Sequence, residues 1–163
     1  MDPLTVAGRY FDAWNRRDPQ AIRDTFAEGG TYTDPVVPGG LDPPGAARYA
    51  EGLFAGFPDL AFAIGREVVG DDGVVCAGWT MTGTHGGPHQ GLPPTGRSVR
   101  LPGADVIRVE GDRVRSVTGD FDTTVLPAQL GLQVIVQPTS VGPFSFGTSV
   151  HASRAAPGPA RSA

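Results

Sequence analysis

Two aspartates, Asp120 and Asp122, are the residues of this sequence whose type and spacing first indicate chemistry. They lie towards the end of the alternating segment 113–125, and alternate residues of a strand share a face, so both carboxylates lie on the side of Val114 and Thr118. In a cavity, such a carboxyl group can act as a general acid or base. At a surface, aspartate simply ends a strand, so the surrounding elements decide between the two interpretations.

Three helices are predicted in the first part of the chain. Apolar residues recur at helical spacing over 3–16, after an aspartate followed by proline, which is a helix start signal. The same signal precedes a second short helix, which begins at residue 19 and ends near 28–30. Segment 31–35 is a brief extended piece, and a proline-rich loop separates it from a third helix over 46–54.

After residue 59 the pattern changes from helical to alternating. Four strands are predicted over 60–69, 73–85, 97–110 and 113–125, with turn signals between them. Helices followed by an antiparallel meander predict an α+β fold, in which the helices pack on one face of a curved sheet and a pocket lies between the layers. The core domain is expected to span residues 1–132.

The last hairpin sets the predicted register of the two acids. A turn centred at 111–112 pairs Asp105 with Thr118, and Gly103 with Asp120, which places Asp105, Asp120 and Asp122 on one face. The other face carries Arg100, Arg108 and Arg115. The acidic face is therefore expected to be the covered one. A one-residue bulge would reverse part of this assignment.

Composition restricts the class of partner. The net charge is −4 and no basic stretch exceeds Arg16-Arg17, which argues against a nucleic-acid binder and favours a small neutral partner. No run approaches the ~20 apolar residues of a membrane span, and no secretory leader is recognisable. Cys76 is the single cysteine, so an internal disulfide is excluded. We expect a cytoplasmic protein that does not bind membranes.

Three short motifs carry a family resemblance. They are the Gly-Thr-His turn at 83–85, the GLPPTG loop at 91–96, and Asp122 followed by Leu126 and the QLG of 129–131. Over residues 4–132 the chain resembles the SnoaL-like polyketide cyclase family. The resemblance implies the NTF2-like fold, a cone-shaped α+β barrel with three N-terminal helices packed on a strongly curved, mostly antiparallel sheet that encloses a pocket.

The resemblance also implies a reaction. Cyclases of this family close a polyketide ring by intramolecular aldol chemistry, with an aspartate as acid and base and no cofactor, and Asp122 matches that aspartate. Asp120 or Asp105 nearby would raise its pKa. We therefore expect a cyclase or isomerase that acts on a polyketide-like or other carbonyl compound. A homodimer formed through the outer sheet face is also implied.

His85 is a further catalytic candidate, because an imidazole at the end of a strand can bind a substrate oxygen or orient a carboxylate; it can also pin the glycine-rich loop. His85 and His89 do not make a convincing metal pair, since their spacer is irregular and a third ligand is missing. Asp34 either matches an acid of the family or forms a turn before Pro35. The predicted substrate-binding residues are Tyr32, Asp34, Phe54, Trp79, His89 and Asp105.

Two departures from the family pattern bear on activity. Gly78 stands where related sequences often carry arginine, and losing that donor from a pocket wall would change the substrate or abolish catalysis. Beyond the domain, 133–151 is predicted to be an extension with two short strands, and 152–163 a disordered tail.

Two other functions remain open. One is hydrolysis of an epoxide, as in relatives that resemble limonene-epoxide hydrolase, which needs an arginine between acids inside the pocket. The other is a non-catalytic module for ligand binding or dimerisation on the same scaffold.

Overall fold

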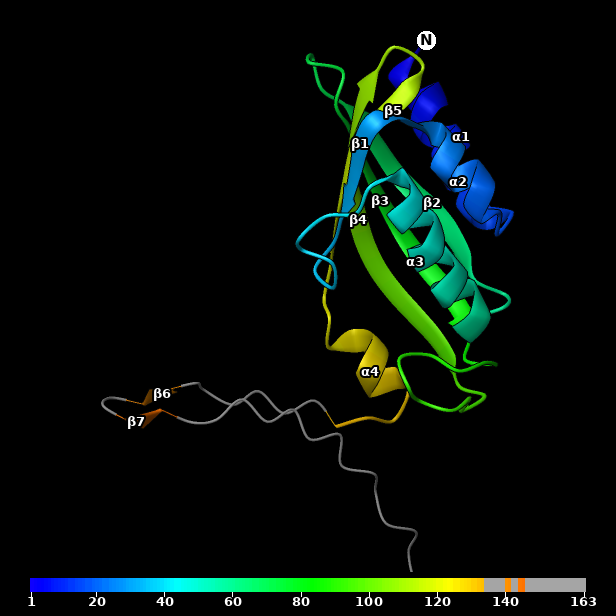
Figure 1. The fold of residues 1–163 in the computed structure, drawn as a ribbon, viewed down its shortest axis with the longest axis vertical. Helices are drawn as coiled ribbons and strands as arrows, with labels where there is room; N and C mark the ends of the chain where they lie inside the picture. The colour runs from blue at the N-terminus through cyan, green and yellow to red at the C-terminus, as the bar shows by residue number, and fades with distance from the viewer. Residues whose placement is uncertain (134–139, 142–143, 146–163) are drawn as a thin grey trace, which may run out of the picture.

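The computed structural model describes residues 1–133, 140–141 and 144–145 (Figure 1). Within the predicted extension, β6 (Ser140–Val141) and β7 (Phe144–Ser145) form an antiparallel pair. The rest of that extension and the predicted tail 152–163 lie outside the described residues. In the described part of the chain, no helix has the length and apolar character needed to cross a membrane.

Three helices begin with the same local signal. They are α1 (Pro3–Asn15), α2 (Pro19–Thr25) and α3 (Pro43–Gly56). The aspartates Asp2, Asp18 and Asp42 precede them, and each accepts a hydrogen bond from a backbone N–H of the first turn, at 3.1, 3.0 and 2.7 Å. The third of these caps was not recognised in the sequence, so α3 begins three residues before the predicted helix.

Five strands form one sheet in the order β1-β5-β4-β3-β2. Their bounds are β1 (Phe26–Thr33), β2 (Ala61–Val69), β3 (Val75–Thr84), β4 (Ser98–Glu110) and β5 (Arg113–Phe121). β2 to β5 are antiparallel neighbours, and β1 adds to β5 in parallel. The three helices lie on one side of the curved sheet, and the short α4 (Val125–Gln129) lies near its end (Figure 1). The predicted α+β fold is confirmed, but the sheet does not close into a barrel.

A bulge changes the register of the β4–β5 hairpin. Near the turn Val109 pairs with Val114, but the register shifts after Arg108, so that Asp105 pairs with Gly119 and Ala104 with Asp120. Every residue of β5 beyond the bulge is displaced by one position from the predicted pairing, and a displacement of one residue reverses the face of a side chain. The predicted placement of Asp120 on the covered face is therefore wrong.

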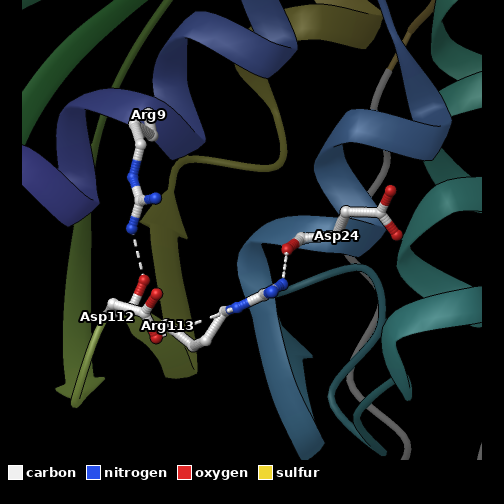
Figure 2. A network of polar contacts seen from close by, with 4 residues as sticks. All are labelled: Arg9, Asp24, Asp112 and Arg113. Carbon is white, nitrogen blue, oxygen red and sulfur yellow. Dashed lines mark hydrogen bonds and ion pairs between the residues drawn. The ribbon is translucent and has the colours of Figure 1, made fainter.

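Arginines fix the tip of this hairpin to the helices. Arg9 on α1 donates to the backbone carbonyl of Asp112, and Arg113 donates to the backbone carbonyl of Asp24 on α2 (Figure 2). The Arg113 guanidinium also lies 3.9 Å from the Asp112 carboxylate. These contacts hold the hairpin against the helical layer beside the bulge.

Candidate active site

A cavity, called here the central cavity, lies between the helices and the inner face of the sheet. Most of its wall is aromatic or aliphatic, which is the usual character of a small-molecule site. The described residues that line it are Tyr10, Phe11, Trp14, Tyr32, Asp34, Val36, Tyr49, Leu53, Phe62, Trp79, Met81, His89, Gln90, Leu101, Asp105, Phe121, Thr123, Leu126 and Pro127. Two of them, Asp34 and Asp105, are carboxylic acids.

Asp105 is the acid of the cavity whose proton affinity is most altered. It points inward from β4 and is 5% exposed. Burial raises the pKa of Asp105 to about 6, and the charge of Asp34 adds to this rise. The Trp79 indole donates a hydrogen bond of 2.9 Å to Oδ1 of Asp105 and partly opposes the rise. A carboxyl group with a pKa near neutrality can both accept and return a proton under physiological conditions.

Two glycines make room for the pair of Asp105 and Trp79. Gly103 pairs with Trp79 across the sheet, and a Cβ at Gly103 would overlap the indole ring. Gly119 pairs with Asp105, and a Cβ there would lie 3.2 Å from Oδ1 of Asp105. The indole can therefore lie against β4 and direct its N–H at the carboxylate because residue 103 has no side chain.

Asp34 is held by the protein itself. Oδ2 accepts hydrogen bonds from the hydroxyls of Tyr32 and Tyr49, at 2.9 and 2.8 Å. Oδ1 accepts from the backbone N–H groups of Val36 and Val37, at 2.7 and 3.0 Å. These donors fill the roughly four lone-pair positions of a carboxylate. Asp34 is thus both a turn residue and part of the cavity wall, and it joins β1 to α3.

Asp120 and Asp122 do not line the central cavity. Both are exposed, and Asp120 pairs with Ala104 on the outer face of the sheet. Asp122 accepts hydrogen bonds from the hydroxyl and the backbone N–H of Thr124, at 2.7 and 2.8 Å, which lower its pKa. The prediction that Asp122 lies in a pocket is wrong, because the bulge reverses which side chains face the cavity at this end of the hairpin.

His85 holds the glycine-rich loop. It is fully buried but does not line the central cavity, and its Nδ1 lies 3.0 Å from the Thr95 hydroxyl and 3.2 Å from the Thr95 backbone nitrogen. Its ring packs on that of Phe57, with the ring centroids 5.3 Å apart. Of the two roles considered for His85, this geometry favours the structural one.

His89 does line the cavity, half-buried, and burial followed by the charge of His85 lowers its pKa. Its ring centroid is 6.4 Å from that of His85. Residues 1–133 contain no group of three potential metal ligands among His, Cys, Asp and Glu.

Some of the predicted aromatic site residues line the central cavity, and one packs against a lining residue instead. Tyr32 and Trp79 line the cavity, whereas Phe54 packs behind it against Trp14, with ring centroids 5.7 Å apart. The cavity also contains Tyr10 and Tyr49, which were not among the predicted site residues. The only sequence signal at these positions is helical periodicity, which indicates an inward face but does not separate a cavity wall from solid core.

The structure also changes the interpretation of Gly78. It pairs with Ala104 and lies on the outer face, because the residues on either side of it, Ala77 and Trp79, point inward. An arginine at this position would not reach the cavity, so its loss says nothing about catalysis. None of the described residues that line the cavity is an arginine, which removes the feature required for the epoxide hydrolase alternative.

Known proteins share this architecture. IdmH of Streptomyces antibioticus, a proposed polyketide cyclase, is 25% identical, with a TM-score of 0.71 over 80% of this chain and 99% of IdmH. A proposed polyketide cyclase of Acidithiobacillus ferrooxidans is 26% identical, with a TM-score of 0.68 over 80% of this chain and 95% of that chain. A Catenulispora acidiphila protein with a ketosteroid isomerase-like fold, solved with trimethylamine, is 19% identical, with a TM-score of 0.67 over 82% and 97%.

Among curated proteins, none matches this chain. The sequence profile of the SnoaL-like polyketide cyclases matches residues 4–130, which is most of the chain and includes every element that builds the central cavity. The chain therefore belongs to the SnoaL-like polyketide cyclase family.

Proposed function

We propose that this protein catalyses ring closure or isomerisation of a neutral carbonyl compound, with Asp105 as the acid–base group and without a cofactor. The observation that carries the proposal is the position of Asp105, a buried carboxyl group in an apolar cavity, with a pKa of about 6 and a hydrogen bond from Trp79. Membership of a cyclase family supports the same class of reaction.

The reaction consists of two proton transfers on one carboxyl group. Ionised Asp105 removes a proton from the carbon next to a carbonyl, and the resulting enolate attacks a second carbonyl carbon of the same molecule. The alkoxide formed by that attack then takes the proton back from Asp105. Atoms and charge balance within the substrate, so the product is an isomer and the carboxylate returns to its starting state. The Trp79 N–H keeps Asp105 in one orientation throughout.

The cavity wall favours a neutral apolar substrate. Aromatic and aliphatic side chains form most of it and can hold a flexible chain in a folded conformation, which brings its reacting carbons together. The carboxylates of Asp34 and Asp105 disfavour an anionic ligand, and no arginine among the described lining residues offsets them. The sequence contains no lysine.

Exchange of the α-protons of β-tetralone in heavy water tests the proposal, because that exchange requires only the first proton transfer. Wild-type protein should accelerate exchange above buffer, and Asp105→Asn should reduce the acceleration by at least a hundredfold. Asp122→Asn is the matched control and should retain it, since Asp122 is exposed and bonds to Thr124. Retained exchange in a folded Asp105→Asn variant would remove Asp105 from the mechanism and favour a binding module.

A further inference from the structure

The two tryptophans of this chain differ in what their indole N–H groups bind. Both line the central cavity. The N–H of Trp79 is hydrogen-bonded to Asp105. The Nε1 of Trp14 is buried and has no hydrogen-bond partner among the described residues. Buried polar groups without a partner are rare in folded proteins, and an orphan donor in a cavity wall suggests that a ligand supplies the acceptor.

Packing fixes the orientation of the Trp14 ring. Trp14 is 3% exposed. Its ring meets those of Phe54 and Phe62 nearly edge to face, with centroids 5.7 and 5.6 Å away, and that of Tyr10 at 6.3 Å. A ring enclosed on several sides cannot turn to find another acceptor without displacing its neighbours. The free N–H is therefore preorganised.

Tyr10 offers a second neutral donor one helical turn away. Burial, followed by the charge of Asp105, raises the pKa of Tyr10 well above its usual value, so its hydroxyl keeps its proton at physiological pH. The Trp14 N–H approaches the Tyr10 hydroxyl and thereby opposes part of this rise, although the two groups do not reach hydrogen-bonding geometry. Tyr10 lines the same cavity.

We propose that the N–H of Trp14, together with the hydroxyl of Tyr10, receives the carbonyl oxygen of the ligand. This inference rests on the proposed function, because the oxygen is that of the carbonyl whose α-carbon Asp105 deprotonates. Negative charge grows on this oxygen as the enolate forms, and fixed neutral donors stabilise it most at that stage. The ligand class is accordingly a neutral ketone-containing molecule with an apolar framework.

Nuclear magnetic resonance can observe the donor directly, because a ¹⁵N-labelled chain with two tryptophans has two indole N–H signals. Trp14→Phe assigns them by removing one. β-Tetralone should move the Trp14 signal downfield, whereas tetralin, the hydrocarbon without the oxygen, should not. In Trp14→Phe, β-tetralone should lose roughly fivefold more affinity than tetralin does, because both compounds lose apolar contact with the indole but only the ketone loses a hydrogen bond.

The inference would be overturned if β-tetralone did not bind to the wild type, or if the Trp14 signal responded equally to both compounds. It would also be overturned if Trp14→Phe lost the same affinity for β-tetralone as for tetralin. If Trp14→Phe does not fold, the inference is tested by comparing how the Trp14 signal of the wild type responds to β-tetralone and to tetralin. Tyr10→Phe then serves as the second variant. These experiments measure ligand binding, whereas the proposed function is tested by proton exchange, so either can fail without the other. Asp105→Asn should abolish exchange yet leave the ketone-induced shift of Trp14 intact.

Discussion

Trp79→Phe should raise the pKa of Asp105. The indole N–H donates to the carboxylate, so it stabilises the ionised form more than the protonated form. A hydrogen bond to a charged group contributes about 1.5–3 kcal/mol, and one pKa unit corresponds to about 1.4 kcal/mol. Removal of the donor should move the pKa of Asp105 from about 6 to roughly 7–8.

The functional consequence follows from the ionised fraction at pH 7. With a pKa of about 6, roughly nine-tenths of Asp105 is ionised, and a pKa of ~7.5 leaves roughly a quarter. Exchange of β-tetralone should therefore lose severalfold in rate at pH 7, and the lower limb of its pH profile should move upwards. Carbon-13 signals of the aspartate carboxyl groups, titrated between pH 4 and 9, measure the same pKa independently.

Trp14→Phe is the control, because it removes an indole from the same cavity without touching Asp105. Its carboxyl titration should keep a midpoint near that of the wild type. An unchanged or lowered pKa of Asp105 in folded Trp79→Phe would refute the assignment of Trp79 as the group that stabilises the carboxylate.

Three further predictions concern stability and assembly. Burial raises the pKa of Asp105 in the folded protein, so the contribution of this group to stability is present at low pH and is lost as pH rises through about 6. In denaturant titrations between pH 4 and 7, the free energy of unfolding of Asp105→Asn should therefore rise by up to about 3 kcal/mol relative to that of the wild type. Gly103→Ala should displace Trp79, destabilise the fold by about 1–3 kcal/mol and raise the pKa of Asp105, as thermal melts and carboxyl titration can check. We expect a homodimer through the outer sheet face, where Val106 is 41% exposed; light scattering should show a dimer that Val106→Glu converts to monomer.

Most of the fold could be predicted because its signals are local. Aspartate followed by proline marks the start of helices α1 and α2, and alternation marks β2 to β5. β1 was only partly recognised, because Phe26 follows α2 directly and the glycines at 29–30 interrupt the strand pattern. Strand pairing in parallel with β5 brings together residues distant in sequence, which no local pattern indicates.

The site could be predicted only as far as the register allowed. Asp105 was placed correctly on the inner face because it lies on β4, where alternation is unbroken. Asp120 and Asp122 were misplaced because a bulge beside Arg108 depends on how the hairpin packs against the helices. Helical spacing predicts an inward face for Trp14, but it cannot show that the indole N–H lacks a partner among the described residues.

The hydrogen bonds that hold Asp34 in place affect how tightly the cavity can hold a ligand. Hydrogen bonds from Tyr32 and Tyr49 join strand and helix before any ligand arrives. A binding wall that is already ordered loses little conformational entropy on association, so more of the contact energy remains as affinity. Tyr49→Phe should therefore weaken ligands of every shape by a similar factor, because it loosens the wall without altering the groups that recognise the carbonyl.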